Sequence, residues 1–305
     1  MRRVSLLGNL DRLAIVLIVL LASVFPVDLL TSAPMEPPGS AGQLSGKQGE
    51  VVLLKIGVGG DATAVTGQFL SRRIPFFRDG DRYLGLIGID LQDAPGMHEL
   101  TLDVVSPQGH RTLSYNVLVI KEHYPVQHLT LPKDKVDLDD DNLVRVKAEQ
   151  EIVRTALNQI SQERLWNVAF VQPVEGPTTG AFGRLRIING QARNSHNGED
   201  IAAPLGTEVA VMNDGIVRLT VDHFFSGKGV YVDHGLGLYS MYFHLSQILV
   251  EPGQAVTRGQ VIGKVGASGR ASGPHLHWGV RVNGARVNPL SLTKLSFTPV
   301  PASVR

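Results

Sequence analysis

The sequence predicts a mainly β protein, with a small N-terminal β-domain, a linking helix and a larger C-terminal antiparallel sheet. Short apolar runs alternate with turn signals over most of the 305 residues, and glycine is abundant, at 33 residues. Helix-type periodicity is concentrated in a single segment near the middle of the chain. At this length the chain can bury two modest cores, so two folded domains and a terminal segment are expected.

Residues 49–122 are predicted to form an immunoglobulin-like β-sandwich. A strand-like run extends from Val51 to Val58, and further strands are expected at residues 68–70, 74–77, 83–89, 98–105 and 111–120. Turn signals separate them at residues 78–81, 94–96 and 106–109. Several short strands at this spacing are typical of a sandwich. A spacer, a cell-wall positioning module, a docking site and a mask for another site all remain open as roles.

Residues 123–167 are predicted to link the two domains through a helix. Apolar residues recur there at helical spacing, namely Leu143, Val146, Ile152, Val153, Ala156, Leu157, Ile160 and Leu165. Charged residues between them make the helix amphipathic, and Asp141 or Asn142 is suited to the N-cap. We expect this helix to pack on one or both domains.

Residues 1–33 are predicted to be a signal peptide or a membrane anchor, followed by a linker at 34–48. Arg2 and Arg3 precede an apolar run from Leu13 to Phe25, which is shorter than the roughly 18–20 residues of a comfortable membrane span. Both alternatives export the chain, so we expect it in the periplasm or anchored in the inner membrane facing the periplasm.

Composition excludes several classes. The chain has no cysteine, which rules out disulfides, thiolate metal ligands and lipid attachment at cysteine. Its formal net charge of +1 gives no electrostatic case for nucleic acid. The clusters at residues 57–60 and 263–266 lack the context of phosphate-binding loops, so we also reject nucleotide binding.

Two short segments carry the chemistry, at residues 196–200 and 273–278. His275 and His277 are separated by one residue on a predicted strand, so both imidazoles face one side, about 6.6 Å apart along the chain. Asp200 supplies an anionic oxygen, which together with neutral imidazoles suits Zn²⁺. From spacing alone, either histidine could bind the metal while the other meets a substrate. A single histidine would favour a structural interpretation, which the combination outweighs.

A third segment, residues 239–246, has alternating character, carries His244 and is surrounded by glycine-rich turns. The set of motifs resembles the lysostaphin-type zinc metallopeptidases, also called the LytM family. The resemblance extends from about Phe182 to Pro289 and includes Phe182-Gly183-Arg184, Asp200-Ile201-Ala202-Ala203-Pro204, Gly206-Thr207, the Tyr-x-His-Leu-Ser segment ending at Ser246 and Gly273-Pro274-His275-Leu276-His277. We accordingly place a metallopeptidase domain at residues 168–295 and a tail at 296–305.

The resemblance implies a role for each matching position. His196, Asp200 and His277 match the family's three zinc ligands, with one zinc ion per catalytic domain, and His244 and His275 match its two catalytic histidines. Members of the family cut the stem peptides and cross-bridges of bacterial peptidoglycan. Glu199 departs from the pattern, because the family usually has an apolar residue there. Its side chain should point away from the metal if Asp200 points in, so we expect the site to be retained.

The implied mechanism uses zinc to lower the pKa of water and to polarise the scissile carbonyl. His275 is assigned as general base and His244 as the residue that stabilises the oxyanion, although the two roles could be exchanged. His223 and His234 are predicted to be structural. His98, His110, His123 and His128 belong to no motif, and Tyr242 and Arg193 are candidates for the wall of a substrate groove, Tyr242 equally for packing.

The predicted function is zinc-dependent hydrolysis of peptide cross-links in peptidoglycan. A D,D-endopeptidase is favoured because no wall-binding repeats accompany the exported context, and a glycine bridge is the less favoured alternative. The alternatives are a non-catalytic LytM-like activator of cell-wall amidases and a wall-binding scaffold. Activators of this kind usually lack part of the metal set, whereas all five positions are present here. A regulatory protein partner is compatible with either function. A sharper hypothesis for the linking helix is that it covers the zinc cleft in a resting state.

Overall fold

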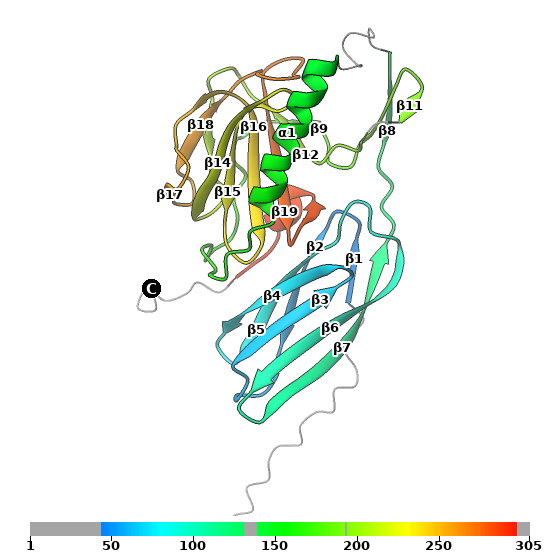
Figure 1. Ribbon diagram of the computed structural model, residues 1–305, viewed down its shortest axis with the longest axis vertical. Helices are drawn as coiled ribbons and strands as arrows, with labels where there is room; N and C mark the ends of the chain where they lie inside the picture. The colour runs from blue at the N-terminus through cyan, green and yellow to red at the C-terminus, as the bar shows by residue number, and fades with distance from the viewer. Residues whose placement is uncertain (1–43, 131–138, 193, 298–305) are drawn as a thin grey trace, which may run out of the picture. The chain divides into compact units, whose positions relative to one another are not determined.

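The computed structural model describes residues 44–130, 139–192 and 194–297 and confirms the mainly β class (Figure 1). Within these residues the strands form an N-terminal β-domain, a larger C-terminal sheet and a separate three-stranded sheet, and one long helix follows the β-domain in the chain. No helix among them is long and apolar enough to span a membrane. The predicted leader at residues 1–33, the first part of the linker at 34–48 and most of the tail lie outside the described residues.

The N-terminal β-domain is a barrel-like sheet of seven described strands. In chain order they are β1 (Leu44–Lys47), β2 (Val51–Ile56), β3 (Ala64–Phe69), β4 (Arg72–Asp79), β5 (Arg82–Gly88), β6 (Gly96–Ser106) and β7 (Gly109–Ile120). Their order in space is β1-β7-β6-β3-β4-β5-β2. The first half of β4 pairs with β3 and the second half with β5, so one strand carries the sheet around a corner. The strands expected from the sequence are all present.

The core of this β-domain follows from period-two alternation. Leu100 and Leu102 of β6 point inward, as do Val117 and Val119 of β7, and all four are at most 1% exposed. The two strands pair antiparallel along their whole length. The residues between them face solvent, as expected for a sheet with one buried face.

Helix α1 (Asp140–Leu157) begins at a different cap from the two that we predicted. The N-cap is Asp139, whose backbone is extended and whose carboxylate accepts a hydrogen bond of 2.8 Å from the Asn142 N–H. Asp140 and Asp141 instead occupy the first turn, where negative charge is favourable at a helix N-terminus. The predicted cap residues therefore stabilise the helix from inside it.

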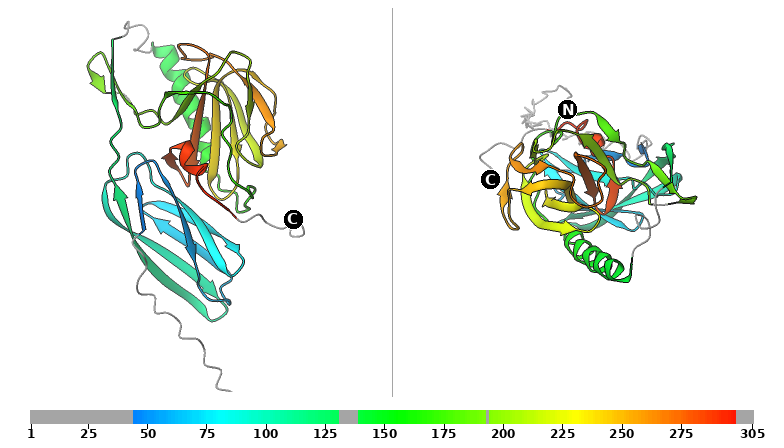
Figure 2. Two further views of the ribbon diagram at one scale, coloured as in Figure 1. Left: turned by 180° about the vertical axis from the view of Figure 1, so that it is seen from behind. Right: turned by 90° about the horizontal axis from the view of Figure 1, so that it is seen from above.

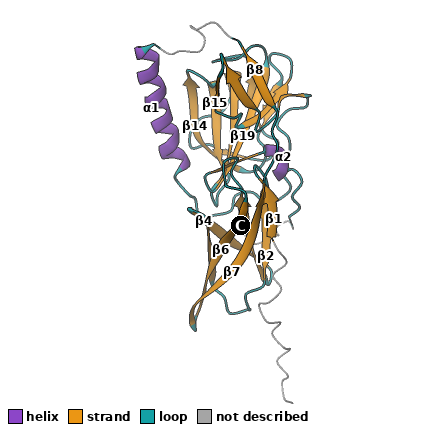
Figure 3. Cartoon of the chain, turned by 90° about the vertical axis from the view of Figure 1, so that its right-hand side faces the viewer, coloured by secondary structure: helices purple, strands orange, loops and turns teal. Residues whose placement is uncertain are grey.

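The apolar stripe of α1 is narrower and shorter than predicted. Val146 and Ala156 are buried, whereas Ile152 remains 52% exposed. Ile160 and Leu165 lie beyond the last helical residue. Figures 2 and 3 show α1 running along one side of the C-terminal sheet next to β14 and β15, where Arg145 donates a hydrogen bond to the Asp222 carbonyl.

The C-terminal domain is built on an antiparallel sheet, as predicted. Its strands are β9 (Thr178–Gly180), β12 (Gly198–Ala202), β13 (Glu208–Ala210), β14 (Gly215–His223), β15 (Gly227–Asp233), β16 (Leu238–Ile248), β17 (Ala255–Val256), β18 (Val261–Val265), β19 (His275–Val282) and β20 (Ala285–Val287). The main order is β17-β14-β15-β16-β19-β12-β9. A separate three-stranded sheet joins β8 (Val126–Leu129), β10 (Leu185–Ile188) and β11 (Gln191–Ala192), and the short helix α2 (Pro289–Leu292) follows β20.

Two buried residues of the β-domain join the hydrophobic core of the C-terminal domain, while the rest form a core of their own. Val51 and Leu86 of the β-domain belong to the same buried cluster as Trp166 and Trp278. Phe77 adds an edge-to-face contact with Trp166, at 5.2 Å between ring centres. The β-domain is therefore packed against the C-terminal sheet by buried apolar surface, in addition to being linked to it by the chain.

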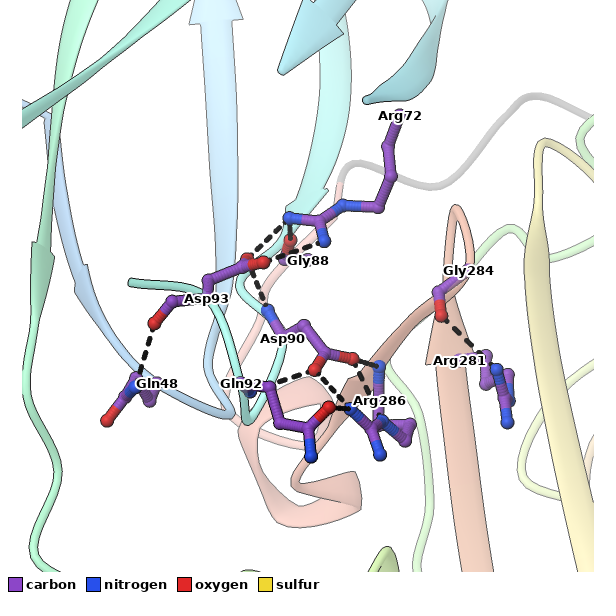
Figure 4. A network of polar contacts seen from close by, with 9 residues as sticks. All are labelled: Gln48, Arg72, Gly88, Asp90, Gln92, Asp93, Arg281, Gly284 and Arg286. Carbon is purple, nitrogen blue, oxygen red and sulfur yellow. Dashed lines mark hydrogen bonds and ion pairs between the residues drawn. The ribbon is translucent and has the colours of Figure 1, made fainter. Parts of the chain in front are cut away.

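A polar network reinforces this contact at the β19–β20 hairpin (Figure 4). The Asp90 carboxylate accepts hydrogen bonds from the Arg286 backbone N–H at 2.7 Å and from its guanidinium at 2.6 Å. The Asn283 amide donates to the Leu86 carbonyl at 2.9 Å. Burial opposes the charge of Asp90, but the bonds from Arg286 hold the pKa of its carboxyl below the ordinary value.

We expect Asp90→Asn to destabilise the protein by roughly 2 kcal/mol, because Arg286 then loses a partly buried anionic partner. Urea unfolding followed by tryptophan fluorescence measures the change, since Trp166 lies at this junction. Asp61→Asn is the matched control, because Asp61 is exposed and makes no ion pair within the described residues. Equal unfolding midpoints for the two variants would contradict the importance of this network.

Candidate metal centre

The register of two strands places two of the predicted metal ligands side by side. Strands β12 and β19 pair antiparallel with Asp200 directly opposite His277. Residues opposite each other project from the same face of the sheet, so the carboxylate and the imidazole meet. His196 lies in the loop that precedes β12. Its backbone is fixed on both sides, because its N–H donates to the Arg184 carbonyl and its carbonyl accepts from the Gly183 N–H.

The three side chains form a compact set of donor atoms. His196 Nε2 lies 3.0 Å from His277 Nδ1 and 3.0 Å from Asp200 Oδ1, and His277 Nδ1 lies 2.8 Å from the same oxygen. Ligand atoms around a tetrahedral zinc ion with bonds of about 2.0 Å are about 3.3 Å apart. The set therefore needs only a small expansion to hold such an ion. Side-chain type and spacing both fit a divalent metal at this position.

Neighbouring groups prepare these ligands for a cation. The Ala181 carbonyl lies 3.1 Å from His196 Nδ1 and can only accept, so the proton of a neutral ring resides on Nδ1 and the Nε2 lone pair faces the cluster. Burial opposes the charge of Asp200, but the close ring nitrogens of His196 and His277 hold the pKa of its carboxyl far below the ordinary value. Burial also lowers the pKa of His277, which keeps this ligand neutral near pH 7.

The two predicted catalytic histidines lie beside this cluster and are oriented in the same way. His275 Nδ1 lies 2.8 Å from the Gly273 carbonyl, and His244 Nδ1 lies 2.8 Å from the Ser268 carbonyl. In the neutral rings each Nε2 therefore carries a free lone pair. His275 Nε2 is 3.8 Å from Asp200 Oδ1, and the His244 and His275 ring centres are 4.7 Å apart. All five predicted residues are brought together.

The backbone of His244 adopts an uncommon conformation. Its φ of +62° lies in the left-handed region, which few residues other than glycine occupy. It lies where the pairing between β15 and β16 changes register. The preceding residue, Phe243, stacks on His277 with a ring-centre distance of 5.7 Å and an interplanar angle of 16°. This local twist brings two consecutive side chains toward the same cluster. Burial lowers the pKa of His244 to about 4.

Glu199 is buried, and its side chain is turned away from the metal ligands. Its neighbour Asp200 faces the cluster, and on a strand the next residue projects from the opposite face. There the Glu199 carboxylate accepts a hydrogen bond of 2.9 Å from the backbone N–H of Phe182. The departure from the family pattern thus leaves the donor set intact.

The remaining candidates have other places in the structure. Tyr242 is fully buried, and its hydroxyl accepts a hydrogen bond from the Met212 N–H, so it packs in the core and does not line a groove. His234 is also buried, with its two ring nitrogens at 2.7 Å from the Asp214 carbonyl and from the Ser240 hydroxyl. His223 lines a cavity beside α1. Arg193 lies outside the described residues.

Several features of the site were not found from the sequence. The acceptor carbonyls of Ala181, Gly273 and Ser268 orient three histidines, yet a backbone carbonyl has no signature in a sequence. Gly198, in contrast, could have been noticed in the sequence, because it lies between the candidate ligands His196 and Asp200. A Cβ atom there would lie 2.4 Å from His277 Nε2 and 2.7 Å from the Trp278 carbonyl oxygen, so only glycine leaves room for the ligand ring.

Comparison with known proteins decides the family. The model of Peptidase family M23 matches residues 194–289, which contain all five site residues. The crystal structure of an M23 peptidase from Pseudomonas aeruginosa aligns with a TM-score of 0.64 and 33% identity, over 81% of this chain and 94% of that one. The chain belongs to peptidase family M23. This confirms the resemblance to lysostaphin-type metallopeptidases that the motifs indicated.

Curated relatives match about a third of this chain. The peptidoglycan DD-endopeptidase ShyA of Vibrio cholerae is 44% identical over 106 residues, which are 35% of this chain and 25% of that protein. The DD-carboxypeptidase/endopeptidase Mpg of Neisseria meningitidis is 42% identical over 97 residues, which are 32% of this chain and 22% of that protein. The chain thus matches about a quarter of the length of these relatives.

We expect His277→Ala to abolish stable zinc binding, because two ligands remain and the loss should exceed the roughly 10–100-fold that removal of an outer-shell partner costs. Metal content after dialysis, measured by mass spectrometry, reports the result. His110→Ala is the control, because His110 is an exposed histidine of the β-domain. Full zinc occupancy in His277→Ala would show that the ligand assignment is wrong.

Gly198→Ala tests the steric requirement around the same ring. We expect zinc affinity to fall roughly 10–100-fold, because the added methyl group displaces His277 while the donor set stays complete. A competitive titration with a chromogenic chelator measures the affinity. Gly57→Ala is the matched control, since a Cβ atom there has no neighbour within 4 Å. Unchanged affinity in Gly198→Ala would mean that the ring does not need this space.

Proposed function

We propose that this chain is a zinc-dependent endopeptidase that hydrolyses the peptide cross-links of bacterial peptidoglycan. The observation that carries the proposal is the complete set of three convergent ligand atoms, with two further histidines whose Nδ1 atoms each contact a backbone carbonyl. The names of the curated relatives favour a D,D bond as the one cut.

The chemistry divides between the metal and the chain's own residues. A bound zinc ion would supply Lewis acidity, polarising a carbonyl and lowering the pKa of water toward neutrality. His196, Asp200 and His277 would hold it, with His196 fixed in its tautomer by the Ala181 carbonyl. Three protein ligands leave a position open for water or substrate, as in other catalytic zinc sites.

The proposed base is His275. Its Nε2 lies 3.8 Å from a ligand oxygen, and its Nδ1–H is committed to the Gly273 carbonyl, so Nε2 can take a proton from the attacking water. The His244 ring centre lies 4.7 Å from that of His275 and 6.1 Å from that of His277. It is placed to stabilise the oxyanion when its Nε2 carries a proton. The two histidines could exchange these roles without a change in geometry.

A periplasmic location completes the proposal. The basic start and apolar run within residues 1–33 favour export, either by a cleaved signal peptide or by a retained inner-membrane anchor. The substrate would then be in the same compartment. A protein partner could regulate the enzyme at the surface of the β-domain or at α1.

The linking helix gives a specific form to the masking hypothesis. Two cavities lie between α1 and the sheet, and one of them reaches the candidate ligand His277. Val153 and Leu157 of α1 line both cavities. Its attachment includes polar contacts, with the Glu149 carboxylate accepting from the Phe224 N–H at 3.0 Å. We propose that α1 forms one wall of the substrate cleft and limits access to it.

We expect the zinc-loaded full chain to convert dimeric muropeptides into monomers when it is incubated with purified cross-linked peptidoglycan. Chromatography coupled to mass spectrometry counts both species and identifies the bond cut. His277→Ala serves as the inactive comparison. Intact dimers with zinc bound would contradict an active endopeptidase. A gain of hydrolysis in Arg145→Ala/Glu149→Ala, which loosens α1, would then indicate masking, and no gain would favour an amidase activator.

A further inference from the structure

Strand β19 carries a positively charged side chain, Arg281, on the same face as the candidate metal ligands. Side chains alternate along a strand, so His275, His277, Gly279 and Arg281 share one face. Arg281 lies four residues beyond His277, which places the two Cα atoms about 13 Å apart. Gly279 lies between them and has no side chain. An extended chain can therefore pass along this face from the metal centre toward the guanidinium.

Two cavities follow the same path. One, of about 110 Å³, is lined by His277 and reaches Arg281, and the other, of about 380 Å³, lies between α1 and the sheet. Both are bordered by the same four side chains, namely Val153, Leu157, Tyr231 and Arg281. Arg281 is thus placed where the cleft from the metal centre opens into the larger space under α1.

The other charges along this cleft are already paired. Arg286 is bound by Asp90 at 2.6 Å, Arg154 by Glu151 at 2.6 Å, and Glu149 by Arg145 at 2.7 Å. Within the described part of the chain Arg281 has no carboxylate partner. Among the described residues its guanidinium donates only to the Gly284 carbonyl, at 3.4 Å, and lies apart from the Asp90–Arg286 pair (Figure 4).

The smaller cavity therefore has a positive lining. Among the residues that the structure describes, its charged lining residues are Arg281 and Arg286, and no aspartate or glutamate borders it. Because Asp90 neutralises Arg286, Arg281 contributes the uncompensated charge. A partly buried guanidinium with five fixed N–H donors matches a carboxylate, which it can bind through two parallel hydrogen bonds.

We propose that Arg281 forms a subsite that binds a carboxylate of the peptide substrate. The proposal rests on the proposed endopeptidase function, since it places the carboxylate on the same peptide that is cut. A distance of about 13 Å corresponds to about four residues of extended chain from the scissile bond, and the reach of the arginine side chain shortens this. A C-terminal carboxylate and a side-chain carboxylate of diaminopimelate share this chemistry.

The test compares soluble peptide dimers that contain one D-alanyl to diaminopimelyl cross-link. One dimer has all carboxylates free, a second has its C-terminal carboxylates converted to amides, and a third has its side-chain carboxylates amidated. We expect the zinc-loaded full chain to cleave the free acid with a kcat/KM about 10–100-fold above that of one amidated dimer, as expected for a charge-assisted pair. The amide that causes the loss identifies the source of the carboxylate.

Arg281→Gln should remove this preference. It should lower kcat/KM for the free acid to the kcat/KM of the amidated dimer that is cleaved more slowly, and it should leave kcat/KM for that dimer unchanged. Arg281→Lys should restore part of it. Arg82→Gln is the control, since Arg82 is exposed on β5 and borders neither cavity. Equal losses on all three dimers in Arg281→Gln would instead assign Arg281 a structural role, and no loss at all would also overturn the subsite.

Binding of the same dimers, measured by calorimetry, separates this inference from the proposed function. Tighter binding of the free acid that depends on Arg281, without any hydrolysis, would support the subsite and contradict the endopeptidase. Hydrolysis that is indifferent to amidation would support the endopeptidase and contradict the subsite.

Discussion

The site depends on the pairing register of β12 and β19. Asp200 faces His277 across these strands, and the same register places Gly198 opposite Gly279 and Ala202 opposite His275. A shift of one residue would turn Asp200 to the opposite face and replace it with Glu199. The register is fixed by the other face of the pair, where Ile201, Leu276 and Trp278 are at most 1% exposed. Core packing on one face thus determines the ligand geometry on the other.

Strand β19 connects three parts of the molecule. Its first residues supply the candidate metal ligand His277 and the proposed base His275, and its far end carries Arg281. The hairpin that follows it is bound to the β-domain through Arg286 and Asn283. Because Val51 and Leu86 also enter the core of the C-terminal domain, a displacement of the β-domain would act on the same strand that positions His277. The β-domain thus contacts, through this hairpin, the strand that carries His277.

The sequence was sufficient to predict strands and site residues where the residue chemistry and the periodicity indicate the same structure. The alternation at residues 275–282 and the short runs of the β-domain predicted strands that the structure contains. The motifs named the five site residues that the fold brings together. Boundaries governed by local hydrogen bonds were harder. Asp139, Asp141 and Asn142 can all cap a helix, and the choice depends on which backbone is extended. Features made by tertiary packing could not be predicted at all. The acceptor carbonyl of Ser268 is 24 residues from His244, and the Asp90–Arg286 pair joins residues 196 positions apart.

Glu199 shows how a departure from a family pattern can support the site it adjoins. The side chain faces the protein interior and accepts a hydrogen bond from the Phe182 N–H. On one side of Phe182, the Ala181 carbonyl accepts from His196 Nδ1, and on the other, the Gly183 N–H donates to the His196 carbonyl. The carboxylate therefore fixes the centre of the segment that holds His196 at two points. An apolar residue at this position could only pack there, whereas glutamate ties the segment directly to the strand that carries Asp200.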